Sequence, residues 1–145
     1  MKSRTCRTAS VAALTGITLA LGLVNAGSAS ASTPSGCGSV RQIGSTKYIK
    51  YKGQSAASVK QYYGCGKNYA YLLIWDSFRK HHKWKTATVG VMTPEGRLHA
   101  VKWKDSPAYE MWSAGYATTN CTQAFGLVQV GSGADKADAK SSMVC

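Results

Sequence analysis

Hydrophobic and polar residues alternate over residues 47–52, where Ile49 and Tyr51 share one face and two lysines share the other. A period of two is typical of a β-strand that buries one face and exposes the other to water. Large apolar residues alternate with polar ones again over residues 108–116. We therefore expect a strand in each of these two segments.

Residues 84–92 and 97–104 alternate in the same way and are separated by only four residues. In the connecting residues 93–96, proline stands second and glycine fourth, which is the pattern of a tight turn. Two alternating segments joined by a short turn predict a β-hairpin.

Two other segments are mostly apolar. Residues 68–75 are rich in aromatic side chains and follow Gly64-Cys65-Gly66, so they fit a central strand that is covered on both faces. Residues 124–130 predict another apolar strand, which ends at Gly131. Residues 55–63 lack glycine and proline, and this is where we expect a short helix.

Together these patterns predict five or six short strands, separated by turn residues and without helical crossovers. A sequence of this kind folds as a mainly β domain. We expect an antiparallel β-sandwich or a small barrel with at most one short helix.

The start of the chain has a different composition. Three basic residues precede an uncharged apolar run at residues 11–24, which is too short to span a bilayer comfortably. Ala29-Ser30-Ala31 then supplies small residues where signal peptidase needs them. We expect residues 1–31 to be a signal peptide that is cut after Ala31. Residues 32–145 would then be a single secreted, extracellular domain, with no second apolar run long enough to span a membrane.

Cleavage would remove Cys6 and leave an even number of cysteines, namely Cys37, Cys65, Cys121 and Cys145. Four cysteines in an oxidising compartment predict two disulfides, and three pairings are open. The pairing of Cys37 with Cys65 and of Cys121 with Cys145 closes the most local loops. A bridge to Cys145 would also tie down the polar C-terminal segment at residues 131–145.

The predicted leader contains three of the eighteen Lys and Arg residues and none of the six acidic ones. Fifteen basic and six acidic side chains then remain, a formal charge of +9. Outside a cell, this charge favours anionic partners such as teichoic acids, phospholipid head groups or acidic proteins, without specific binding of nucleic acid. The alternative is that the charge only keeps the protein soluble.

Residues 78–85 are the densest cluster of functional side chains in the sequence. They contain four cationic residues, two histidines and two aromatic residues between two predicted strands. Cationic side chains attract phosphates and carboxylates, and an exposed tryptophan can stack on a base or a sugar. The candidate binding residues are Arg79, Lys80, His81, His82, Lys83, Trp84 and Lys85. In the alternative interpretation, Trp84 belongs to the core and the charges only face water.

Few residue patterns in the chain point to catalysis. His81 and His82 are adjacent and normally point apart, and His99 is alone in a predicted strand, so we expect no metal site. Neither a Gly-x-Ser-x-Gly elbow nor a phosphate-binding glycine loop occurs, and we expect no cofactor. A glycosidase pair formed by Asp105 with Glu110 or Asp76 remains open.

These observations favour a secreted, non-catalytic interaction module. It would serve as an adaptor subunit of an extracellular protein assembly or as a binder of the envelope surface, through a protein partner or an anionic envelope polymer. A secreted inhibitor of a protease or another enzyme is the alternative, because small disulfide-linked domains suit a rigid binding loop. A small cell-wall hydrolase is a third possibility.

Several short phrases of the sequence point to a known group of proteins. They are Tyr69-Ala70-Tyr71, Trp75-Asp76-Ser77-Phe78-Arg79, Cys121-Thr122 and Gly126-Leu127-Val128-Gln129-Val130-Gly131. Residues 37–131 thereby resemble small secreted proteins of filamentous actinobacteria of the Streptomyces type, among them the adaptor subunits of umbrella-shaped toxin particles. That resemblance implies a protein that joins a lectin subunit to a large toxin subunit. The five residues between the predicted cut and Cys37 depart from it, because they are short for a docking arm.

Overall fold

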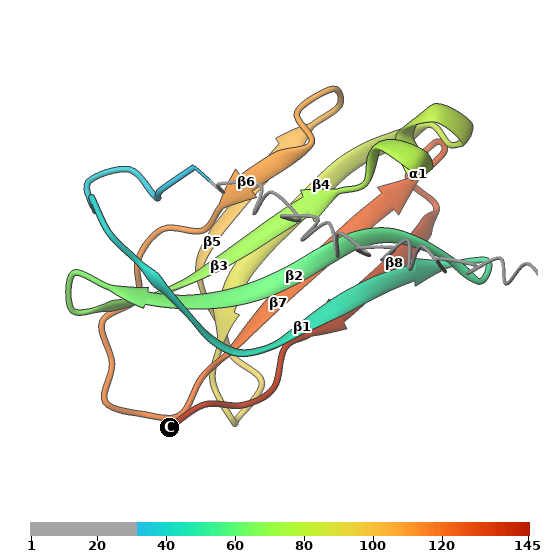
Figure 1. Ribbon diagram of the computed structural model, residues 1–145. Helices are drawn as coiled ribbons and strands as arrows, with labels where there is room; N and C mark the ends of the chain where they lie inside the picture. The colour runs from blue at the N-terminus through green and yellow to red at the C-terminus, as the bar shows by residue number, and fades with distance from the viewer. Residues whose placement is uncertain (1–31) are drawn as a thin grey trace, which may run out of the picture. The chain divides into compact units, whose positions relative to one another are not determined.

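The computed structural model describes residues 32–145, which form two four-stranded antiparallel sheets packed face to face (Figure 1). The predicted signal peptide, residues 1–31, lies outside the described residues. This β-sandwich confirms the expected fold class, with one short helix and two disulfides.

We call the first sheet sheet A. Its strands, in the order in which they pair, are β1 (Arg41–Tyr51), β2 (Gln54–Gly64), β3 (Lys67–Ile74) and β6 (Glu110–Trp112). The turn between β1 and β2 consists of Lys52 and Gly53, whose φ angles of 46° and 81° are both left-handed. Two left-handed residues suit a two-residue hairpin because their twist matches that of the strands.

Sheet B is built around the predicted hairpin. Its strands, in pairing order, are β5 (Leu98–Asp105), β4 (Trp84–Met92), β7 (Gln123–Val130) and β8 (Asp135–Lys140). β4 and β5 pair antiparallel, with Met92 opposite Leu98, which confirms the hairpin. The helix α1 (Asp76–His81) carries the chain from β3 in sheet A to β4 in sheet B.

The core lies between the sheets and consists of side chains from alternate strand positions. Fully buried members include Ile49, Val59 and Leu72 from sheet A and Val89, Val91 and Val128 from sheet B. Gly126 allows the sheets to approach closely, because a Cβ at this position would lie 2.8 Å from Cδ1 of Leu72. Burial of this apolar surface is the main source of stability.

Two expectations about the strands were wrong. Residues 55–63 belong to β2 and not to a helix, because Ala57, Val59 and Gln61 face the core at every second position and β2 pairs with a strand on each side. The one described helix is α1 instead. The described residues form eight strands rather than five or six, since residues 55–63 belong to β2 and the polar C-terminal segment contains β8.

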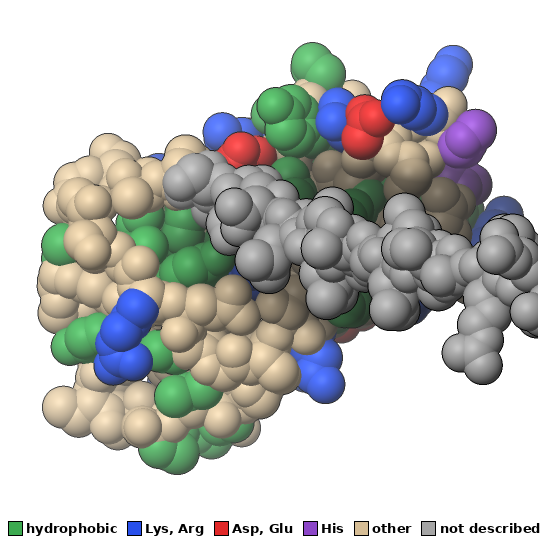
Figure 2. Space-filling view, viewed as in Figure 1, with side chains coloured by type: hydrophobic (Ala, Val, Ile, Leu, Met, Phe, Trp, Pro, Cys, Tyr) green, Lys and Arg blue, Asp and Glu red, His purple; other side chains and the backbone are tan. Residues whose placement is uncertain are grey.

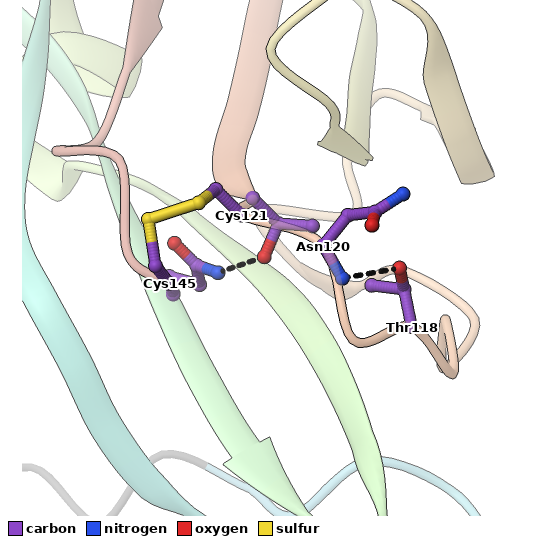
Figure 3. The surroundings of a disulfide bond; sticks show 6 residues. Thr118, Asn120, Cys121 and Cys145 are labelled. Carbon is purple, nitrogen blue, oxygen red and sulfur yellow. Dashed lines mark hydrogen bonds between the residues drawn. A yellow bond between two sulfur atoms is a disulfide. The ribbon is translucent and has the colours of Figure 1, made fainter.

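Both disulfides have the pairing that the loop lengths favour. Cys37 bonds to Cys65, and Cys121 bonds to Cys145 (Figure 3). Beside the second bond, the backbones of Thr122 and Val144 pair with each other. The bridge to Cys145 thus fastens the C-terminal segment to the start of β7, as predicted.

Candidate binding surfaces

The predicted cluster begins on α1, where Asp76 binds two of its cations. The carboxylate of Asp76 lies 3.1 Å from Nη2 of Arg79 and 2.7 Å from Nζ of Lys80. The hydrogen bond from Lys80, together with the charges of Lys80 and Arg79, lowers the pKa of Asp76 below its usual value. Figure 2 shows the cationic, acidic and histidine side chains close together where α1 lies. Asp76 therefore neutralises part of the cluster's charge.

His82 is held in place by packing. Its ring stacks on Phe78 with a centroid distance of 4.7 Å and meets the ring of Tyr51 edge-on at 5.5 Å. Its Nε2 lies 3.1 Å from Oε1 of Gln54 in β2. His82 thus joins the connection between α1 and β4 to the hairpin of β1 and β2.

Trp84 begins β4 and is only 7% exposed. It belongs to the hydrophobic core, as the alternative interpretation has it. Only a small part of its ring is accessible, so a ligand can touch the edge of the ring but cannot stack on its face.

Four of the seven candidate residues line one hollow of about 390 Å³. Its lining residues, which we call the basic corner, are Arg79, His82, Lys83, Trp84, Ser106 and Pro107. Ser106 donates a backbone hydrogen bond of 2.9 Å to the carbonyl of Lys85, which holds the connection between β5 and β6 against β4. The other candidates, Lys80, His81 and Lys85, are exposed outside this lining.

The guanidinium of Arg79 has a fixed position at the rim of the basic corner. It lies 4.2 Å over the ring of Tyr109, a cation–π contact, and it also binds Asp76. Its Nε is buried without a hydrogen-bond partner among the described residues. Lys83, in contrast, is exposed and has no ion-pair partner in the described part of the chain. Lys83 is therefore the cation of this corner that is most available to a ligand.

A second surface lies between β5 and β6, which end their sheets on the same flank. We call it the open flank. A hollow of about 640 Å³ is found there, lined among others by Lys102, Lys104, Glu110 and Trp112. Nζ of Lys104 lies 3.5 Å from the carbonyl oxygen of Glu110, so a lysine spans the gap. The sequence pattern predicts only strands in this region and does not reveal the surface.

The segment that precedes β1 reaches the open flank. Oγ of Ser32 donates a hydrogen bond of 2.6 Å to Oε1 of Glu110, and Nε1 of Trp112 donates one of 3.2 Å to Oγ of Ser32. Glu110 also acts on Tyr71 of β3. Burial, and then the charge of Glu110 and a hydrogen bond with it, raise the pKa of Tyr71 far above its ordinary value. These polar contacts fix Ser32 against β6.

No group of three or more His, Cys, Asp or Glu residues that could hold a metal ion occurs within residues 32–145. None of the helices described there is long and apolar enough to cross a membrane. Comparisons with known proteins find no matching family model, no similar curated protein and no similar solved structure. The resemblance to the actinobacterial adaptor subunits stays a prediction.

Proposed function

We propose that this protein is a secreted, non-catalytic binding module whose basic corner holds an anionic polymer of the cell envelope. The observation that supports it best is the exposed Lys83 beside the fixed guanidinium of Arg79, at the rim of a hollow of about 390 Å³. The two disulfides fit an extracellular site of action.

The physical case rests on repeated weak contacts. An exposed lysine and a phosphate attract each other only modestly in water, and salt screens them over about 8 Å at physiological ionic strength. A polymer with many phosphates can engage Lys83, the neighbouring Lys85 and the hollow at once, and such contacts add up. The excess of basic over acidic residues strengthens the encounter at long range.

The test compares two double variants of equal charge. Lys83→Ser with Lys85→Ser removes the exposed cation of the corner and its neighbour, and Lys67→Ser with Lys140→Ser removes the same charge from other exposed positions. We expect the corner variant to bind purified teichoic acid about tenfold more weakly and the control less than about twofold more weakly, at low salt, in a sedimentation assay. Equal losses in both variants would mean that only the net charge matters.

Other outcomes would assign other functions. Stoichiometric inhibition of a secreted protease, without polymer binding, would replace the proposal with an inhibitor. Turnover of peptidoglycan that is abolished by Asp105→Asn or Glu110→Gln would make the protein an enzyme.

A further inference from the structure

β5 is an edge strand that leaves one side unpaired. It pairs with β4 alone, while β6 on the same flank belongs to sheet A and pairs with β3. The residues after β6 reach the start of β5, where Ala114 N–H donates a hydrogen bond of 2.9 Å to the carbonyl of Ala100. Among the described residues, no strand pairs with the outer side of β5 from Val101 to Asp105. An edge of this kind presents a row of N–H and C=O groups to any chain that approaches in an extended conformation.

The register identifies which backbone groups point outward. Ser106 N–H donates a hydrogen bond to the carbonyl of Lys85, so these two residues form a hydrogen-bonded pair. Along an antiparallel strand, such residues alternate with residues whose backbone groups point away from the neighbouring strand. Trp103, opposite Thr88, then directs its N–H and C=O away from β4. Asp105 also directs both groups outward, although its carbonyl already accepts a hydrogen bond of 3.2 Å from Ala108.

The two faces of β5 differ in chemistry. Trp103 is 66% exposed and Val101 is 44% exposed, which makes them two of the most exposed large hydrophobic residues. Lys102 and Lys104 lie opposite Val89 and Ala87, so they point toward the other face and line the hollow of the open flank. A strand added here would find apolar surface on one face and two cations on the other.

These charges disfavour a second copy of the same chain as the occupant. If two β5 strands paired antiparallel around Trp103, Lys102 of each would lie opposite Lys104 of the other. Like charges directly opposite each other destabilise a strand pair. Lysines on an edge strand oppose self-association in this way, yet they attract a strand with carboxylates at the same positions.

We propose that β5 is a docking edge for an extended, acidic segment of a partner protein, which adds to sheet B as a fifth strand. Backbone hydrogen bonds at Trp103 and Asp105 would supply affinity, and Lys102 and Lys104 would select alternating Asp or Glu side chains. This surface adjoins the basic corner, whose lining includes Ser106 and Pro107, but it uses other residues and another kind of partner. Occupied together, the two surfaces would make the protein an adaptor between the envelope and a second protein.

The test uses a synthetic peptide of about nine residues with alternating valine and glutamate, a length that β-strand addition can accommodate. The protein is the form purified from culture medium after expression of the full chain. We expect backbone amide signals in NMR spectra to shift along β5, and a scrambled peptide of equal composition to bind more weakly. Shifts at Arg79, Lys83 and Trp84 without shifts in β5 would overturn the docking edge and leave the basic corner intact.

Variants at one position separate the backbone from the side chain. In Trp103→Pro the outward N–H is removed, which an edge strand tolerates because that N–H faces away from the sheet. We expect it to weaken peptide binding about tenfold, and Trp103→Thr, which keeps the N–H, about threefold. Undiminished binding by Trp103→Pro would overturn the proposal.

A charge reversal provides the positive test. The double variant Lys102→Glu with Lys104→Glu should no longer bind the glutamate peptide. It should instead bind a peptide in which lysine replaces each glutamate. Failure of the parent protein to bind the glutamate peptide at about 1 mM would also overturn the docking edge, since weaker contacts are not specific. A dimer of the parent protein that breaks up on addition of peptide would identify a second copy as the natural occupant, against the proposal.

Discussion

The two flanks of this sandwich differ in how the edges of the two sheets are joined. On the closed flank, where β1 meets β8 and the residues after it, short polar groups join the sheets directly. The hydroxyl of Tyr51 donates a hydrogen bond of 2.8 Å to Asp135, and Ser45 N–H donates one of 2.8 Å to Oγ of Ser142. On the open flank, Lys102 and Lys104 line a hollow of about 640 Å³ between β5 and β6.

The comparison shows how local residue choice decides whether a sandwich edge is sealed. Gly44, with a φ angle of 70°, lets the closed flank come together, because a Cβ there would lie 2.8 Å from Oγ of Ser142. On the open flank, the long cationic side chains of Lys102 and Lys104 line a hollow instead, and the gap between the sheets is not closed. We therefore expect the closed flank to contribute stability, while the proposed docking edge lies on the open flank.

The largest expected effect comes from Gly44→Ala on the closed flank. The new Cβ meets Ser142 and Val144 in a left-handed conformation, and we expect a loss of about 2 to 4 kcal/mol in the free energy of unfolding, measured by urea titration. Gly53→Ala is the matched control, because its φ of 81° is also left-handed but no atom lies within 4 Å of the added Cβ. The control should lose only about 1 kcal/mol, and equal losses would contradict the sealing role of Gly44.

The open flank should show its own sensitivity at high pH. In the folded protein, the pKa of Tyr71 is raised above the unfolded value of about 10. The neutral Tyr71 therefore contributes fully to the free energy of unfolding below pH 10, and this contribution is lost as the pH rises through the folded pKa. We expect roughly 1 kcal/mol to be lost at pH 11, and Tyr71→Phe to remove this part of the alkaline loss. An unchanged alkaline loss in Tyr71→Phe would contradict this role of Tyr71.

A smaller effect is expected for the hydrogen bond that crosses the closed flank. Tyr51→Phe keeps the ring against Phe78 but removes the donor to Asp135. We expect a loss of about 0.5 to 1 kcal/mol in thermal or urea unfolding. Tyr48→Phe, on the same strand and 50% exposed, should change stability by less than about 0.3 kcal/mol. A similar loss in both variants would show that the cross-flank bond is unimportant.

The smallest effect is predicted for the lysines of the open flank. Lys102→Ser with Lys104→Ser should change the free energy of unfolding by less than about 0.5 kcal/mol, because both side chains are exposed. A loss above about 1 kcal/mol would mean that the lysines support the fold and that the contrast between the flanks is one of degree.

Sequence patterns predicted the central strands because β7 buries every second residue, while β3 and β4 are mostly apolar and bury most of theirs. The patterns did not predict a strand where few residues are buried. β8 reads Asp-Lys-Ala-Asp-Ala-Lys, and only Ala137 is buried, so an edge strand looks like a polar tail. The sequence of β2 is compatible with a helix because its alanines and serines fit either period, but β2 pairs with a strand on each side, and this makes it a strand.

The candidate site was predicted only in part, for a similar reason. The basic cluster is contiguous in sequence, but Ser106 and Pro107 join it through the tertiary fold. The open flank was visible only as alternation of Val101, Lys102, Trp103 and Lys104. Alternation does not tell a half-buried strand from an unpaired edge, because both have the same period and only sheet pairing separates them.

The attachment of Ser32 to Glu110 has a practical consequence for protein engineering. A fusion partner or affinity tag joined directly ahead of Ser32 would start beside the hollow of the open flank and compete with anything that docks there. Cys145 lies at the other end of the described chain, bonded to Cys121 and exposed. A tag placed after Cys145 leaves the open flank accessible and is the better choice for interaction screens.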